Sequence, residues 1–237
     1  MTWRVPPYDR AVDDAAAFIR ATWKIHGIVV AGSIVRGEAG PNSDLDIFVV
    51  HAEAWRVRDQ RRFAGVPAEL FVNPPERIRS YFASEHAEGR PCTAHMFATG
   101  VVLAGAEPIV GELVAEARDW LAKPLEPTAA ELTARRYQAV DLLDDARDLR
   151  DVDPAGAALL LAEAVQLIAG YAFWQRARFQ PRRKDLVRAL VAIDPVAADQ
   201  VRAFARARGE DAERIALALA DHVLGVDTFF EWTSDRS

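Results

Sequence analysis

Three carboxylates in the first third of the chain have the types and spacing of a metal site. Asp44 and Asp46 occupy alternate positions of the apolar run "DLDIFVV", and Glu69 is the only acid within "AELFV". Alternate side chains of a strand point to the same face, so we expect the two aspartates together, with Cα atoms roughly 6.6 Å apart. Carboxylate oxygens are the ligands that Mg²⁺ takes beside substrate phosphates. The three acids therefore predict a site for two divalent metal ions.

A Gly-Ser pair precedes these acids and has the character of a phosphate-binding turn. Gly32 and Ser33 end the apolar run "GIVVAGS", and "IVRGE" after them is expected to form a helical turn. Glycine permits close approach of the backbone, and amides at a helix start favour phosphate. The serine hydroxyl can add a hydrogen bond to a phosphate oxygen. The sequence thus predicts a phosphate cradle beside the carboxylates.

Gly-Ser, ten intervening residues, Asp-Leu-Asp and a later acid in an apolar strand resemble the DNA polymerase beta-like nucleotidyltransferase superfamily. The string "GSIVRGEAGPNSDLDIFVV" is similar to its small bacterial members, which include minimal, aminoglycoside and lincosamide nucleotidyltransferases. The resemblance covers residues 28–72, and the helical second half is similar more loosely. It implies that Gly32 and Ser33 bind the nucleotide, while Asp44, Asp46 and Glu69 hold two Mg²⁺ ions.

The activity that the resemblance implies is transfer of a nucleoside monophosphate, AMP from ATP, onto an acceptor hydroxyl with release of pyrophosphate. A small molecule such as an aminoglycoside-like antibiotic is the expected acceptor, which would make the protein an antibiotic-resistance enzyme. Two alternatives stay open. One is an antitoxin-type enzyme that adenylylates a partner protein. The other is a nucleotide-binding module without turnover, although such a module has no need of three acids.

Two residues of the second half are further candidates. Glu163 is the only charged residue between positions 155 and 174, where an isolated carboxylate is unfavourable unless it is paired, hydrogen-bonded or in a wet cleft. Similar aminoglycoside enzymes use a glutamate of the helical domain to deprotonate the acceptor. Glu163 is therefore either that general base or a structural acid, paired with an arginine or at the bundle surface. By the same resemblance Lys184 reaches the triphosphate, unless it merely begins a solvated helix.

The elements that position the first half follow from hydrophobic periodicity and turn residues. We expect helices over 8–25, 74–86 and 108–122, strands over 27–33 and 44–50, a helix or strand over 93–105, and a hairpin over 55–73. The hairpin turn is centred on Gly65 and Pro67, and the basic residues of "WRVRDQRR" are expected to face solvent.

The second half predicts helices alone. Beyond "KPLEPT" nothing has the pattern of a strand, and helical segments are expected at about 129–150, 155–177, 182–193 and 196–232, the last with a break at Gly209. The predicted fold class is α+β: a small mixed-sheet nucleotidyltransferase domain, 1–124, followed by an all-helical substrate-binding bundle, 125–237.

Composition limits the partners and the compartment. A formal net charge of −6 over 237 residues argues against stable nucleic-acid binding. A single cysteine, Cys92, excludes an internal disulfide and agrees with a reducing, cytoplasmic location, and the N-terminus has no apolar signal segment. The apolar stretch 155–174 is Ala-rich and carries Glu163, which favours a bundle helix over a membrane span. A homodimer stays open.

Overall fold

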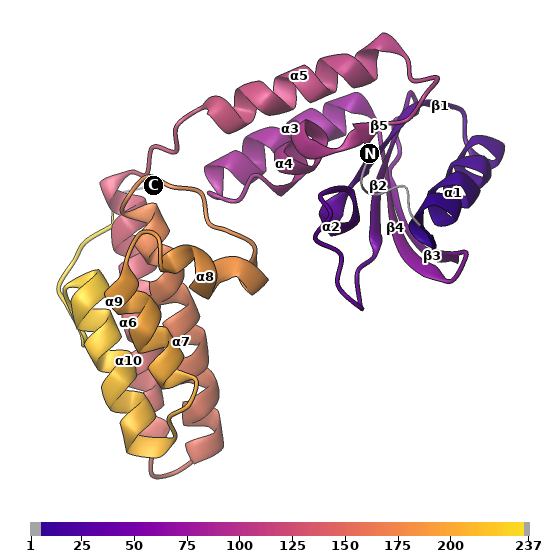
Figure 1. Cartoon of the computed structure of the whole chain (residues 1–237). Helices are drawn as coiled ribbons and strands as arrows, with labels where there is room; N and C mark the ends of the chain where they lie inside the picture. Colours follow the sequence, from indigo (N-terminus) through magenta and orange to yellow (C-terminus); the bar gives the residue numbers. More distant parts are fainter. Residues whose placement is uncertain (1–5, 235–237) are drawn as a thin grey trace. The chain divides into compact units, whose positions relative to one another are not determined.

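The structure is a computed structural model that describes residues 6–234. It divides into two compact units, Met1–Lys123 and Pro124–Ser237 (Figure 1). The fold class is α+β, as the sequence predicts, because the first unit contains a mixed sheet with helices and the described part of the second contains helices alone. The predicted domain boundary lies one residue beyond this division.

The first unit is a five-stranded mixed sheet with helices on both faces. The strand order is β3-β4-β2-β1-β5, with β2 and β4 parallel and the other neighbours antiparallel. Its elements are α1 (Tyr8–Thr22), β1 (Ile25–Ala31), α2 (Gly32–Val35), β2 (Leu45–His51), β3 (Val57–Phe63), β4 (Val66–Asn73), α3 (Pro75–Ala87), α4 (Cys92–Thr99), β5 (Val101–Val102) and α5 (Pro108–Ala122). Residues 93–105, expected as a helix or a strand, contain both.

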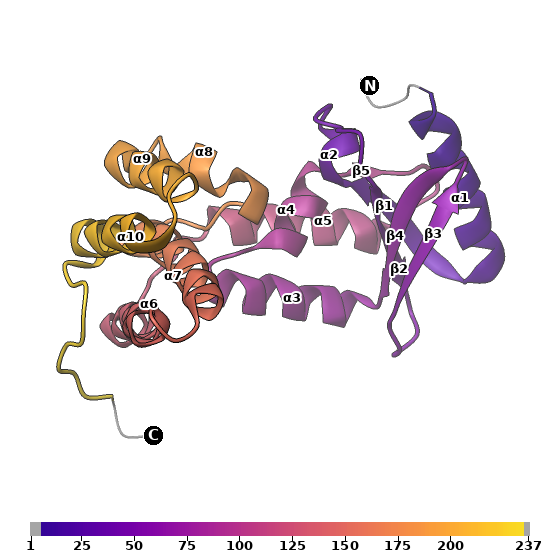
Figure 2. The same ribbon diagram turned by 90° about the horizontal axis from the view of Figure 1, so that it is seen from below.

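Each face of the sheet has its own apolar core. Figure 2 shows α1 on one side of the strands and α3, α4 and α5 on the other. Ile47 of β2 packs with the α1 layer, whereas the next residue, Phe48, packs with Phe82 and Phe97 in the α3–α5 layer. This alternation places every second residue of β2 and β4 on the α3–α5 face.

The β3–β4 hairpin has a two-residue turn, which fixes its register. Ala64 and Gly65 both have positive φ, 46° and 82°, as a type I′ turn requires. The turn therefore precedes the predicted centre, and Pro67 lies within β4. Because Phe63 pairs with Val66, each earlier residue of β3 has a determined partner on β4.

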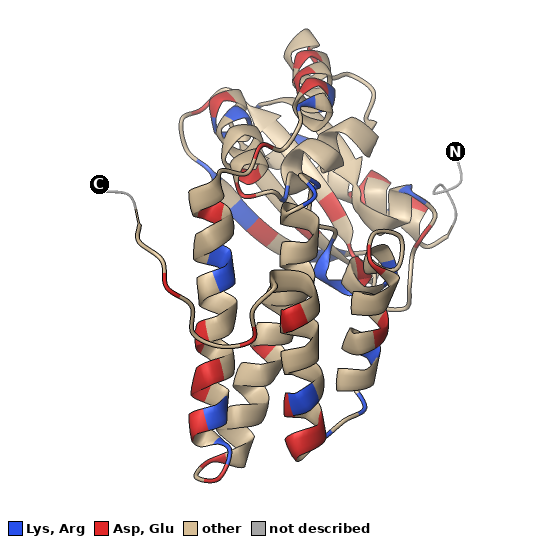
Figure 3. Ribbon diagram, turned by 90° about the vertical axis from the view of Figure 1, so that its left-hand side faces the viewer, with Lys and Arg blue, Asp and Glu red and all other residues tan. Residues whose placement is uncertain are grey.

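The second unit is a helical bundle. Its elements are α6 (Ala129–Leu149), α7 (Pro154–Trp174), η1 (Arg183–Asp185), α8 (Leu186–Leu190), α9 (Pro195–Phe204) and α10 (Gly209–Leu224). The predicted segment 196–232 is thus two helices, and α10 ends at Leu224 because Gly225 takes the left-handed conformation that closes a helix. Figure 3 shows acidic and basic residues interspersed along these helices.

Helix α7 is the core of this bundle. Its most apolar 18-residue window has a mean hydropathy of 1.6, and by length and composition alone the helix could cross a membrane. Core helices of soluble bundles meet the same criteria. In this structure 56% of the window is buried, and α7 packs against α6 and α10.

Candidate nucleotide and metal site

Asp46 and Glu69 lie side by side on the sheet. They are directly paired in the parallel register of β2 and β4. Two residues further along each strand, on the same face, Phe48 pairs with Phe71. The aromatic pair lies against the α3–α5 layer, and its rings stack with centroids 4.8 Å apart. The acidic pair lies toward the start of both strands and is partly exposed. One face of the sheet is therefore apolar under the helices and acidic beyond them.

Gly32 makes room for the carboxylate of Asp46. Its φ is +89°, a conformation that side chains disfavour, and a Cβ at this position would collide with Oδ2 of Asp46. Ala31, the preceding residue, pairs with Asp46 across β1 and β2. The turn after β1 thus brings its backbone directly against the carboxylate, so that the predicted phosphate-binding turn and the predicted metal ligand are neighbours.

Ser33 is tied to the loop that leads into β2. Its side chain is 8% exposed, and its Oγ lies 3.0 Å from Oγ of Ser43. The Ser43 hydroxyl also accepts a hydrogen bond from the amide of Gly40, at 2.8 Å. The predicted helical turn is present as the four-residue α2. Phosphate binding by Ser33 stays a prediction.

Asp44 differs from its predicted placement. Strand β2 begins at Leu45, which pairs with Ala68 of β4, and Asp44 lies exposed in the preceding loop. That loop turns tightly, with the amide of Ser43 donating to the carbonyl of Gly40 at 3.0 Å. The argument that alternate strand residues share a face therefore does not place Asp44 beside Asp46. Its ligand role rests on its position in the loop next to Ser43.

The carboxylate of Glu69 is held by strand β3. Its Oε1 accepts hydrogen bonds from Nε of Arg58 at 2.8 Å and Nε2 of Gln60 at 2.7 Å. The Glu69 side chain is 12% exposed and that of Arg58 is 64% exposed. Arg58 is exposed, as expected for the basic residues of β3, and it also binds Glu69, which was not predicted from the sequence. The two-residue turn is the sequence signal for this contact. It sets the hairpin register, which pairs residue 60 with 69 and residue 58 with 71 and so brings both side chains near Glu69.

The acids fit Mg²⁺ in type without forming a gathered cluster. Within residues 6–234, no three His, Cys, Asp or Glu side chains come together as a group that could hold a metal ion. Asp46 and Glu69 nevertheless present carboxylate oxygens from neighbouring strand positions, the donor type that hard cations take. Coordination through Oε1 of Glu69 would require this oxygen to leave Arg58 and Gln60.

Glu163 and Lys184 belong to the second unit and not to the unit that holds the acids. Glu163 lies exposed on α7, so the free-energy penalty expected for a buried acid does not arise. Of the structural alternatives, the bundle surface is the one observed. Lys184 is exposed in η1. Their roles as general base and triphosphate ligand stay predictions.

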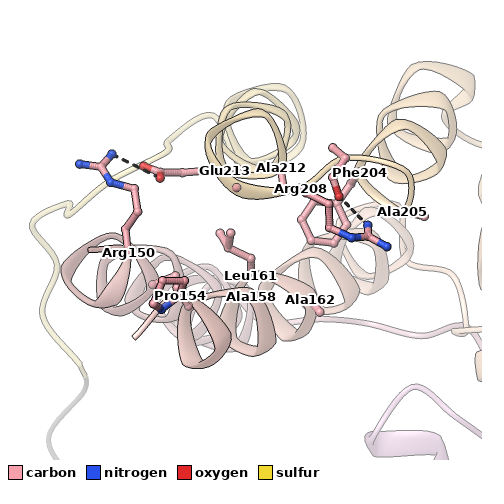
Figure 4. A pocket seen from close by; sticks show the side chains of 14 residues that line it. Arg150, Pro154, Ala158, Leu161, Ala162, Phe204, Ala205, Arg208, Ala212 and Glu213 are labelled. Carbon is pink, nitrogen blue, oxygen red and sulfur yellow. Dashed lines mark hydrogen bonds and ion pairs between the residues drawn. The ribbon is translucent and has the colours of Figure 1, made fainter. Parts of the chain in front are cut away.

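The helical unit also contains an apolar pocket of about 270 Å³ (Figure 4). Alanines, Leu161 and Phe204 form most of its wall, and an ion pair between Arg150 and Glu213 with a separation of 3.5 Å lies at one end. Arg208 lies at the other end. None of the predicted site residues lines this pocket.

Comparison with known proteins gives a match within the first unit. Residues 12–76 match the family model described as "Nucleotidyltransferase domain". This stretch is similar to nucleotidyltransferase domains. It contains β1, α2, β2, β3 and β4, and hence Gly32, Ser33 and the three acids. The match supports nucleotidyl transfer in general, and such domains generally use a nucleoside triphosphate with a divalent metal.

Beyond residues 12–76 the likeness to known proteins is one of fold alone. A crystal structure of a nucleotidyltransferase-like protein from Exiguobacterium sibiricum 255-15 is 12% identical, with a TM-score of 0.54. The alignment covers 92% of this chain and 74% of that chain. No curated protein matches the chain. The particular resemblance to aminoglycoside and lincosamide enzymes stays a prediction.

Proposed function

We propose that the chain is a metal-dependent enzyme that transfers a nucleoside monophosphate, AMP from ATP, to an acceptor hydroxyl and releases pyrophosphate. The observation that carries the proposal is the pairing of Asp46 with Glu69 in the stretch similar to nucleotidyltransferase domains, with the backbone of Gly32 against the Asp46 carboxylate. Three acids and an adjacent glycine turn suit a triphosphate and its cations better than any structural purpose. Acids on neighbouring strands repel unless a cation lies between them.

Each residue has a definite part in this reaction. Asp44, Asp46 and Glu69 would hold two Mg²⁺ ions. When bound, such ions polarise the α-phosphate and lower the pKa of the attacking hydroxyl. Gly32 and Ser33 would bind the β- and γ-phosphates, and Lys184 would neutralise part of their charge. Glu163 would receive the proton of the acceptor hydroxyl as general base.

The acceptor in this proposal is a small molecule. An aminoglycoside-like antibiotic is the class that the sequence resemblance implies, which would place the enzyme in the cytoplasm as a resistance factor. A protein acceptor, as in antitoxin-type adenylyltransferases, is the alternative. Binding of a nucleotide without any transfer is the third outcome.

The test is a transfer assay with the full chain, Mg²⁺ and each of the four nucleoside triphosphates labelled at the α-phosphate. Acceptors are supplied as a panel of hydroxyl-bearing small molecules and, separately, as a cell lysate. We expect label on a small molecule and release of pyrophosphate, both abolished in Asp46→Asn. A labelled protein band instead would favour the protein acceptor, and absence of any transfer from a chain that binds Mg²⁺–ATP would contradict the proposed activity.

A further inference from the structure

A pocket of about 250 Å³ lies in the first unit on the same face of the sheet as the paired acids. Residues of β2, β4, α3 and α4 and of β3 with its preceding loop line it. We name it the arginine pocket, after Arg56 and Arg58. Arg58 joins it to the acidic pair, because its guanidinium binds Glu69 and lies 5.0 Å from the ring centroid of Phe71, a wall residue. A ligand in this pocket therefore lies next to Glu69.

The wall of the arginine pocket is apolar on one side. Phe71 stacks on the buried Phe48 at an interplanar angle of 19°, and Met96 of α4 also lines the pocket. The Phe71 ring, the thioether and the guanidinium of Arg58 suit a planar group, which gains both buried area and ring contact. A pocket of this volume, below the usual range for drug-sized ligands, accommodates one or two rings.

Polar groups converge on the same space. Asn73 lines the pocket and is 5% exposed. A side-chain amide can both donate and accept, so it offers a hydrogen bond to a polar group of a ligand. The hydroxyl of Tyr81 accepts from Nη1 of Arg56 at 3.0 Å and can still donate. The pocket thus contains polar groups beside its apolar wall.

The charge balance of the pocket favours an anion over a cation. Arg56 and Arg58 are both exposed at the pocket. Arg58 is paired with Glu69, and the acid that lines the pocket is Glu85. Both oxygens of Glu85 are bound by Thr93, at 2.6 Å to the amide and 2.7 Å to the hydroxyl. Burial raises the pKa of Glu85 above its usual value despite these hydrogen bonds. An acid already occupied in this way offers little attraction to a cationic ligand.

We propose that the arginine pocket binds the acceptor of the transfer, and that this acceptor is a planar, hydroxyl-bearing compound that is neutral or anionic. The inference rests on the proposed function and changes the acceptor class, because Arg56 and Arg58 repel the ammonium groups of an aminoglycoside. The acceptor oxygen attacks the α-phosphorus of the nucleotide and forms the new P–O bond. The bond to the bridging oxygen of the β-phosphate breaks, pyrophosphate leaves, and the hydroxyl proton passes to a base.

The sole cysteine of the chain reports directly on this pocket. Cys92 lines it and is exposed, and burial together with the nearby Glu85 raises the pKa of its thiol, so its alkylation is slow enough to follow. The experiment measures the rate of Cys92 alkylation by iodoacetamide, as intact mass, in the full chain without metal or nucleotide. The probes are 4-hydroxyphenylacetate, tyramine and kanamycin. The first two share a ring and a phenolic hydroxyl and differ in the sign of their charge.

We expect 4-hydroxyphenylacetate to protect Cys92 in a saturable manner, and tyramine and kanamycin to protect it at least about tenfold more weakly. Arg56→Glu should abolish the preference for the anion, whereas Arg118→Glu, the same charge change at an exposed position of α5 outside the pocket, should not. Asn73→Leu should weaken protection. Because Arg56 is exposed, its variant remains informative even if Asn73→Leu fails to fold.

Equal or stronger protection by the cationic probes, or none by the anion, would overturn the inference. A transfer assay with the same three compounds then separates it from the proposed function. Protection without transfer to any acceptor would contradict the proposed function and leave the anion preference of the pocket in place. Transfer to kanamycin alone would support the proposed function and overturn the acceptor class argued here.

Discussion

Oδ2 of Asp46 occupies the space that a Cβ of residue 32 would need, so the carboxylate and the backbone of Gly32 are in direct contact. The contact explains why the chain has glycine at the end of β1. It also connects the phosphate-binding turn to the acid on β2, so that a change in one displaces the other.

Gly32→Ala should therefore damage both the fold and the site. The new methyl group meets Asp46 in a backbone conformation with φ of +89°, and we expect a loss of about 1–3 kcal/mol in the free energy of unfolding. Mg²⁺–ATP binding should weaken as the carboxylate is displaced. Urea denaturation and calorimetric titration measure the two effects. Gly40→Ala is the matched control, since it lies in the loop that follows and a Cβ there meets nothing within 4 Å.

Arg58→Ala should have little effect on stability without metal and should increase the stabilisation by Mg²⁺–ATP. Without metal it removes an exposed ion pair and changes the free energy of unfolding by only about 0.5 kcal/mol. With Mg²⁺ it leaves the Glu69 carboxylate free of its main competitor, so the stabilisation by Mg²⁺–ATP should increase.

Thermal melts with chelator and with Mg²⁺–ATP compare these two states. Arg61→Ala is the control, because Arg61 lies on the same strand, pairs with Asp59 and contacts Phe18 on the opposite face. An equal response of the two variants to Mg²⁺–ATP would show that the Arg58–Glu69 pair has no part in metal binding.

Asp194 should make the helical unit sensitive to acid. Burial alone would raise its pKa, but hydrogen bonds from the amide of Ala197, from His222 at 2.9 Å and from Arg176 at 3.0 Å together lower the pKa below its usual value. A lowered folded-state pKa stabilises the fold above the unfolded value, and this contribution is lost as the pH falls through the folded value. We expect stability to decline below about pH 4.

Urea denaturation across the acid range tests this dependence on Asp194→Asn. The variant should lose about 1–3 kcal/mol at neutral pH, a discounted value because Arg176 and His222 are each about one-third exposed. The free energy of unfolding of the variant should also fall less steeply as the pH is lowered. Asp199→Asn, in the helix that Asp194 caps and with a side chain 77% exposed, should change neither. A decline of equal steepness in both variants would assign the acid sensitivity elsewhere.

Glu163→Gln separates catalysis from structure. The side chain is exposed on α7, so the substitution should leave the melting temperature unchanged within about one degree. If Glu163 accepts the proton of the acceptor, kcat should fall by about 100-fold with little change in ATP binding. Gln166→Ala, at an exposed position of the next turn, is the control. Unchanged kcat would remove Glu163 from the reaction.

The sequence predicts the parts of the site that local alternation along a strand determines, and not the parts that depend on pairing with a distant strand. Alternation along β2 and β4 was enough to place Asp46 and Glu69 on one face, because the apolar residues between them had to be buried. Asp44 could not be placed in this way, since the start of β2 is set by the pairing of Leu45 with Ala68 on a distant strand. Local pattern does not contain that information.

The sequence left the exposure of Glu163 open and did not predict the pairing of Arg58, for different reasons. Helix α7 is apolar on nearly every face, so periodicity does not distinguish its surface from its core. The Arg58–Glu69 pair could have been inferred from the turn, because Ala64-Gly65 fixes the hairpin register, but only once the turn is placed one residue earlier than Gly65–Pro67 suggests.

The response of Asp46→Asn to Mg²⁺–ATP tests the central claim most directly. The measurement is the melting temperature of the wild type and the variant in chelator and in saturating Mg²⁺–ATP. We predict that Mg²⁺–ATP stabilises the wild type by mass action, and that the variant retains its fold in chelator but loses most of the gain. A variant that gains as much from Mg²⁺–ATP as the wild type would show that Asp46 is not a ligand of the nucleotide-bound metal and would contradict the account.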